Sequence, residues 1–175
     1  NDDVNTMVAD AIEKKFGKLA RTTGTKHTFL GMDIEFIGDK KVAIGTPQHI
    51  LEAIEDFGKD LDEDGDNPAK SKLFAVNHDS VLLPDDKADT YHSVTAKLLW
   101  VSQRSRPDME TTVSFLCTRV QHPTVEDWNK LRRGLKFLKR TISNQRIMGA
   151  DDILKFETFI DASYATHDNM RGHTG

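Results

Sequence analysis

The spacing of apolar residues at the start of the chain predicts a helix followed by a β-hairpin. Apolar side chains recur about every 3.6 residues over 4–16, which indicates an amphipathic helix that ends at Gly17. Two apolar-rich runs follow, over 28–36 and 41–46, and a Gly-Asp pair lies between them. Glycine and aspartate favour tight turns, so we expect the two runs to form an antiparallel hairpin.

A second helix and a long polar segment come next. Pro47 suits the first turn of a helix, and Gly58 suits its end. The apolar face of this helix would consist of Ile50, Leu51, Ile54 and Phe57. Residues 59–89 contain many aspartates and few periodic apolar positions, so we expect this segment to be mostly loop.

Three further helices and one strand are predicted in the second half. Apolar periodicity indicates helices over 89–103 and 108–120. Thr124 can cap a third helix, with Asp127 at the acidic position of a capping box. Alternation over 153–160 predicts a strand. The predicted fold class is therefore α+β, with a short hairpin between helices and a three-helix bundle after it.

Composition excludes few functions. A chain of 175 residues can form one or two compact units, although its hydrophobic fraction of 37% is modest. No apolar run approaches the roughly 20 residues that cross a bilayer, and the first residues do not resemble a secretory signal. We therefore expect an intracellular protein, cytoplasmic or nuclear, that does not act on a membrane.

Charge is distributed unevenly along the chain. Residues 55–89 contain eleven acids and four lysines, whereas residues 97–146 contain eleven basic residues and four acids. The overall charge of -4 hides this contrast. The distribution indicates an acidic connector followed by a helical unit that faces a polyanion.

The predicted third helix of the bundle carries a row of basic residues. Lys130, Arg133, Lys136 and Arg140 follow one another in steps of three and four, so they share one side of the helix. We call these four residues the basic row. A basic row can bind duplex phosphates whatever the base sequence, because each neutralised phosphate releases counterions. The alternative is a charged face that contacts only solvent.

Four motifs resemble one protein family. They are Tyr-His-Ser-Val at 91–94, Arg-Ser-Arg-Pro-Asp at 104–108, Trp-x-x-x-x-Arg at 128–133 and Asp-Ala-Ser-Tyr-Ala at 161–165. In this order they resemble the passage from polymerase to RNase H in Ty1/copia-type retrotransposon reverse transcriptases. The resemblance implies that the chain is a fragment of an RNA-directed DNA polymerase with an adjoining RNase H.

The resemblance also implies a division of the chain. Residues 1–58 would be the end of the polymerase palm, and 59–90 would be the acidic connector. Residues 91–147 would form the thumb or connection, and 148–175 would begin a truncated RNase H-like domain. The implied partners are an RNA/DNA hybrid or DNA duplex and the remainder of the polyprotein.

Two further sites follow from the resemblance. Phe29, Leu30, Gly31 and Met32 resemble the primer grip, a hairpin that holds the primer backbone, although a plain core strand would also explain them. Asp161 occupies the place of the first catalytic, metal-binding aspartate of RNase H, which uses Mg²⁺ or Mn²⁺. An ordinary turn-forming aspartate is the alternative at that position.

The family pattern is incomplete in this chain. The Tyr-x-Asp-Asp motif that holds the polymerase metals does not occur, and the other RNase H carboxylates would lie after Gly175. We therefore expect the fragment alone to bind no metal stably and to be inactive. The alternative is a noncatalytic nucleic-acid-binding module that derives from a decayed or repurposed retroelement.

Overall fold

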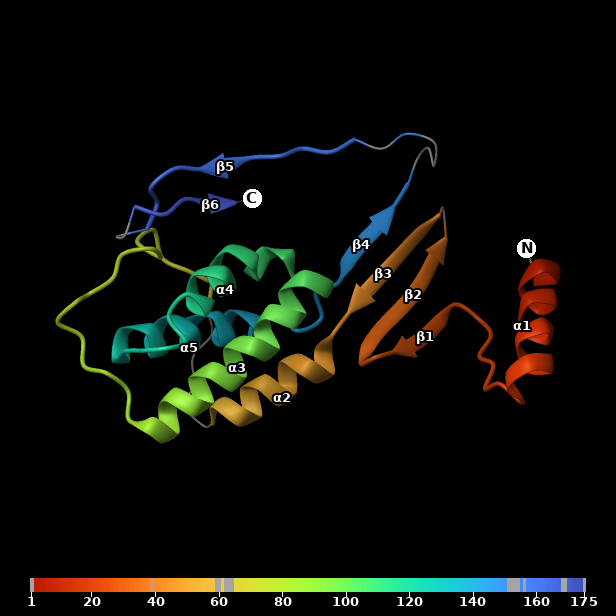
Figure 1. The fold of residues 1–175 in the computed structure, drawn as a ribbon, viewed down its shortest axis with the longest axis horizontal. Coiled ribbons are helices and arrows are strands. Elements are labelled where there is room, and N and C mark those ends of the chain that lie inside the picture. Colours follow the sequence, from red (N-terminus) through yellow and green to blue (C-terminus); the bar gives the residue numbers. More distant parts are fainter. Residues whose placement is uncertain are drawn as a thin grey trace.

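The computed structural model describes residues 2–38, 40–58, 61, 65–150, 155, 157–167 and 170–174. It combines an antiparallel sheet with a bundle of helices, which confirms the α+β fold class (Figure 1). The helices are α1 (Asp2–Phe16), α2 (Pro47–Phe57), α3 (Asp85–Arg104), η1 (Pro107–Met109, a 3-10 helix), α4 (Glu110–Cys117) and α5 (Val125–Arg140). The strands are β1 (Lys26–Phe29), β2 (Met32–Gly38), β3 (Lys41–Gly45), β4 (Arg146–Gly149), β5 (Ala162–Ser163) and β6 (His173–Thr174).

The main sheet has the order β1-β2-β3-β4, and every neighbouring pair is antiparallel. The predicted hairpin is confirmed as β2 and β3. The prediction of one strand over 28–36 is wrong, because a turn at Leu30 and Gly31 divides it into β1 and β2. Strand β4 was not predicted, and it joins the sheet beside β3 after the chain has passed through the bundle.

The strand predicted over 153–160 is not confirmed. Residues 151–154 and 156 lie outside the described part of the chain, and 157–160 form no strand. Ile160 is 88% exposed, so no packing partner replaces the missing sheet neighbour. A segment without a pairing strand has no ladder to satisfy its backbone groups, and alternation alone does not create one.

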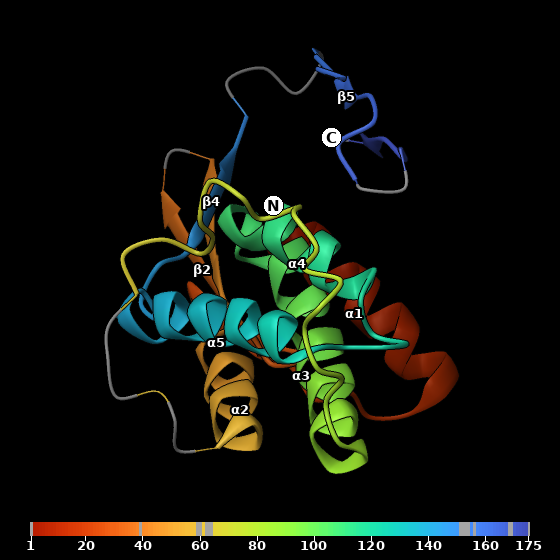
Figure 2. The same cartoon turned by 90° about the vertical axis from the view of Figure 1, so that its left-hand side faces the viewer.

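The bundle core is formed by α2, α3, α4 and α5 (Figure 2). Each helix contributes one apolar face, and the fully buried residues include Ile50, Leu98, Leu116 and Leu135. The predicted inward position of Leu51 is wrong, because this side chain is 50% exposed. Helix α2 contributes Ile50, Ala53 and Phe57 to this core, so the bundle contains α2 in addition to the three predicted helices.

Two predicted helix boundaries shift. The helix expected over 89–103 begins at Asp85, directly after Pro84, where acids in the first turn favour helix formation. The helix expected over 108–120 is the short η1 followed by α4, which ends at Cys117. Both shifts concern ends, where local signals are weakest.

The Arg-Ser-Arg-Pro-Asp motif forms the junction between the sheet and the bundle. Arg106 is only 1% exposed, and its guanidinium binds both oxygens of Asp108 at 2.9 and 2.7 Å. It also donates to the backbone oxygen and the hydroxyl of Thr141, just after α5, at 3.0 and 2.7 Å. The Ser105 hydroxyl shares a 2.5 Å hydrogen bond with Thr46, between β3 and α2. The motif thus has a structural role.

Helix α1 lies beside the sheet at the end of the molecule opposite α4 and α5 (Figure 1). Its predicted boundaries are nearly correct, but its apolar side chains are not buried: Met7 is 65% exposed and Phe16 is 73% exposed. Arg21 binds Asp10 and Glu13, which holds the following loop against the helix. Within the described residues, no helix has the length and apolar character needed to span a membrane.

Candidate nucleic-acid interface

Helix α5 is fixed to the bundle on one side and presents basic residues on the other. Leu131, Leu135 and Leu138 are fully buried, and a β-carbon on Gly134 would lie 3.0 Å from the methyl carbon of Met109. This close packing of one side leaves the opposite side for charged residues. The basic row lies on that other side, and its binding to phosphate stays a prediction.

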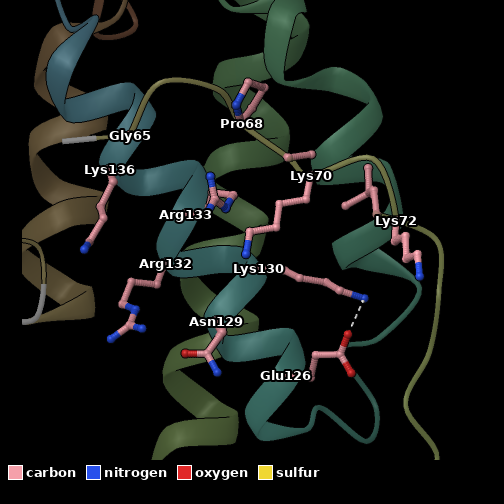
Figure 3. A pocket seen from close by; sticks show the side chains of 12 residues that line it. Gly65, Pro68, Lys70, Lys72, Glu126, Asn129, Lys130, Arg132, Arg133 and Lys136 are labelled. Atoms are coloured by element: carbon pink, nitrogen blue, oxygen red, sulfur yellow. Dashed lines mark ion pairs between the residues drawn. The ribbon is translucent and has the colours of Figure 1, made fainter. Parts of the chain in front are cut away.

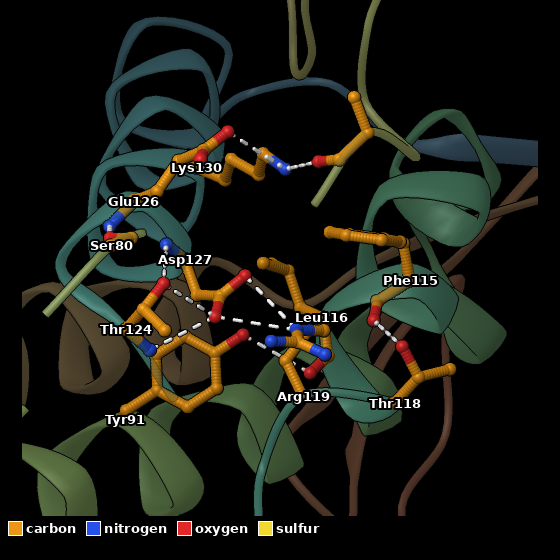
Figure 4. A network of polar contacts seen from close by, with 11 residues as sticks. Ser80, Tyr91, Phe115, Leu116, Thr118, Arg119, Thr124, Glu126, Asp127 and Lys130 are labelled. Atoms are coloured by element: carbon orange, nitrogen blue, oxygen red, sulfur yellow. Dashed lines mark hydrogen bonds and ion pairs between the residues drawn. The ribbon is translucent and has the colours of Figure 1, made fainter. Parts of the chain in front are cut away.

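A capping network holds the start of α5 (Figure 4). The carboxylate of Asp127 is 2% exposed and accepts hydrogen bonds from the backbone N–H and the hydroxyl of Thr124, both at 2.9 Å. The predicted capping box is thereby confirmed. The Arg119 Nε lies 3.3 Å from each Asp127 oxygen, so the buried charge is paired.

Tyr91 lies against the same network and donates from its hydroxyl to the backbone oxygen of Leu116 at 3.1 Å (Figure 4). Burial raises the pKa of Tyr91 far above its usual range, and the negative charge of Asp127 raises it further. The phenol therefore remains a neutral donor at any ordinary pH.

Residues 65–75 lie along the basic side of α5. Lys130 donates to the backbone oxygen of Ala75 at 2.5 Å, Arg133 donates to Asn67 at 3.3 Å, and Arg140 forms an ion pair with Asp66. Part of the predicted acidic connector thus lies next to α5, and its Asp66 pairs with a member of the basic row.

A pocket of about 520 Å³ lies between α5 and residues 65–73 (Figure 3). Among the described residues that line it, one is acidic, Glu126, and six are basic: Lys70, Lys72, Lys130, Arg132, Arg133 and Lys136. We call this the basic pocket. Like charges gathered in a concave site produce a positive potential that attracts anions.

Only part of the basic pocket could be predicted. Lys130, Arg133 and Lys136 belong to the basic row, whereas Arg140 does not line the pocket. Arg132 lies next to Arg133 on the same helix but does not belong to the basic row. Lys70 and Lys72 belong to the predicted acidic connector, and no local pattern places that segment beside α5.

The Phe29–Met32 segment is a tight turn between β1 and β2. Leu30 and Gly31 have φ values of 50° and 74°, and Phe29 pairs with Met32. Phe29 and Leu30 are 60% and 70% exposed, so their side chains are open to solvent. Binding of a primer strand by this turn stays a prediction.

Gly31 lies against the side chain of His49, which leaves no room for a β-carbon. The His49 Nε2 lies 3.4 Å from the backbone oxygen of Leu30, and the His49 ring packs edge-on to Trp100 with centroids 4.3 Å apart. A β-carbon on Gly31 would lie 2.3 Å from that Nε2. Gly31 therefore permits the turn to approach the helical bundle.

Replacing Gly31 with alanine should lower the free energy of unfolding by about 2 kcal/mol, because a left-handed φ and a clash with His49 both oppose the new side chain. Gly38 also has a positive φ, but no atom lies within 4 Å of its added β-carbon. Gly38→Ala is the matched control and should cost about 1 kcal/mol. If urea denaturation showed the same loss of unfolding free energy for both variants, a clash with His49 would be contradicted.

Asp161 precedes β5 and is exposed, and its Oδ1 accepts from the backbone N–H of Ala162 at 2.8 Å. The described residues contain no group of three or more His, Cys, Asp or Glu side chains that could hold a metal ion. Two-metal hydrolysis needs several carboxylates together, so the residues present here do not fit an Mg²⁺ or Mn²⁺ site. A catalytic, metal-binding role for Asp161 stays a prediction that needs further carboxylates.

Sequence comparison finds a relative for part of the chain. Over 84 residues it is 27% identical to "Uncharacterized mitochondrial protein AtMg00810" of Arabidopsis thaliana. The match covers 48% of this chain and 35% of that protein, so the chain spans about a third of the relative's length. No protein-family model matches the chain, and no solved structure does.

Proposed function

We propose that the chain grips a nucleic-acid duplex through the basic side of α5, as a fragment of a retrotransposon reverse transcriptase with an adjoining RNase H. The observation that carries the proposal is the part of α5 that lines the basic pocket, where Lys130, Arg132, Arg133 and Lys136 lie with a single carboxylate, that of Glu126. The motifs at 91–94, 104–108, 128–133 and 161–165 and the partial match to the Arabidopsis protein support a retroelement origin. An RNA/DNA hybrid or DNA duplex would be the partner, together with the remainder of the polyprotein.

Rigid placement suits α5 to this role. The capping box and the Arg119–Asp127 pair fix its start, and the Arg106 bonds to Thr141 fix its end. Cations on a fixed helix meet the phosphate backbone without first losing much side-chain and backbone freedom. Binding of this kind reads no base sequence, which is what copying any template requires.

Members of the basic row should not contribute equally. The Lys130 side chain is 15% exposed and pairs with Glu126 at 3.3 Å, so it is largely committed to the protein. Arg140 is half exposed but pairs with Asp66, which a duplex would have to displace. Arg133 donates to the neutral side chain of Asn67 at 3.3 Å, and Lys136 lines the basic pocket one turn further along α5, so these two are the best choices for a test.

Neutralising Arg133 and Lys136 together, as Arg133→Gln with Lys136→Gln, should weaken binding of a short RNA/DNA hybrid by about tenfold or more at low salt. The slope of log affinity against log salt should become shallower by about 2, because two phosphate contacts are lost. Fluorescence anisotropy over a range of NaCl concentrations measures both quantities.

The matched control is Lys14→Gln with Lys18→Gln, which removes the same charge from exposed positions at and after the end of α1. We expect the control to keep the parental salt slope. If the salt slope of the Arg133 and Lys136 variant were unchanged, the basic row would contact only solvent and not the duplex. A noncatalytic module from a repurposed retroelement would grip a duplex in the same way, so this experiment tests the grip and not the parent's catalysis.

A further inference from the structure

The size of the basic pocket limits what can enter it. Its volume of about 520 Å³ lies in the range of small-molecule sites. A duplex can lie along the mouth of such a pocket but is too wide to occupy it. An occupant must therefore be a single unpaired nucleotide or a group of similar size.

The charge of the pocket favours an occupant that carries phosphate. Lys70 and Lys72 come from the 65–73 wall, and Arg132, Arg133 and Lys136 come from α5 (Figure 3). The described lining holds one carboxylate, that of Glu126, and it pairs with Lys130. Positive groups from two segments can contact the oxygens of one phosphate from different directions.

The pocket is not only polar. Pro68, Ala69 and Leu73 give the 65–73 wall an apolar portion, and Asn129 offers an amide donor and acceptor from α5. An inorganic phosphate could accept a hydrogen bond from the Asn129 amide but would leave the apolar portion unused. A nucleotide would use all of them, because its base has an apolar face and polar edges.

We propose that the basic pocket holds an unpaired nucleotide, with its phosphate, at the single-stranded end of the duplex that α5 grips. This inference rests on the proposed function and extends it from the duplex to its overhang. Arg133 and Lys136 belong to both the basic row and the pocket lining, so the duplex path and the pocket are continuous. That continuity favours an overhang over a free nucleotide as the source of the occupant.

The test compares two labelled substrates, a blunt RNA/DNA hybrid and the same hybrid with a short single-stranded extension. We expect the chain to bind the extended substrate about tenfold more tightly, since extra phosphate contacts and base burial are gained. Lys70→Gln with Lys72→Gln should abolish this preference and leave affinity for the blunt hybrid within about twofold. The control pair Lys14→Gln with Lys18→Gln should keep the preference.

Equal affinity of the wild-type chain for the two substrates would overturn the inference, and so would a preference that survives the Lys70 and Lys72 substitutions. Competition with a free nucleoside triphosphate separates the two sources of phosphate. Displacement of the extended hybrid by equimolar free nucleotide would overturn the overhang as the occupant.

The two proposals fail in different ways. If only the pocket inference is wrong, the blunt hybrid binds and the extension adds nothing. If the duplex grip is wrong, the blunt hybrid does not bind, whereas a single-stranded oligonucleotide still binds in a manner that depends on Lys70 and Lys72.

Discussion

Replacing Arg106 with alanine is expected to lower the free energy of unfolding by about 3 kcal/mol. The side chain is among the largest that are fully buried, so its removal leaves a cavity. The Thr141 carbonyl and hydroxyl lose their donors, and Asp108 loses its bidentate partner. Urea denaturation followed by circular dichroism measures the change.

Arg104 provides the control within the same motif. It is exposed, and its guanidinium lies 5.8 Å from the centre of the Trp100 ring, so Arg104→Ala should cost less than about 1 kcal/mol. Arg106→Lys should recover only part of the loss, because an ammonium cannot bind Asp108 and Thr141 in the planar geometry of guanidinium. Equal stability of the Arg104 and Arg106 alanine variants would show that the junction is not needed.

The second large effect is expected at Asp127. Asp127→Ala should destabilise the protein by about 2–3 kcal/mol, because Thr124 loses its capping partner and Arg119 loses its buried counter-charge. Asp127→Asn keeps an oxygen acceptor for the cap and loses the charge. We expect the melting temperature of Asp127→Asn to lie between those of the wild type and Asp127→Ala.

The neighbouring acid is the control for Asp127. Glu126 is half-buried and pairs with Lys130 at 3.3 Å, within one helical turn. Such pairs contribute little, so Glu126→Ala should cost less than about 1 kcal/mol. If it cost as much as Asp127→Ala, general helix-dipole effects would explain both, and the capping network would not be the cause.

Local features of the fold could be predicted from the sequence. The capping box of α5 depends on Thr124 and Asp127 alone, which are three residues apart. Apolar periodicity likewise located the helices to within a few residues, and the basic row followed from the spacing of its members. Each of these inferences uses neighbours along the chain, where geometry is fixed by the helix itself.

Features that depend on distant residues could not be predicted. The turn at Leu30 and Gly31 carries no Asn-Gly or Asp-Gly signal, and it is positioned by contact with His49. Strand β4 is four residues long and is defined by its pairing with β3. Lys70 and Lys72 reach the basic pocket only because residues 65–73 lie against α5. Long-range packing decided all three.

The return of β4 to β3 makes the order of assembly interdependent. Along the sequence, the helices α2 to α5 all lie between these two adjacent strands. Strand β4 can therefore pair with β3 only after the intervening helices have become compact. Loss of the helical core would in turn release that edge of the sheet. Substitution of Arg106 or Asp127 should therefore destabilise the sheet as well as the bundle, and the two should unfold in one cooperative transition.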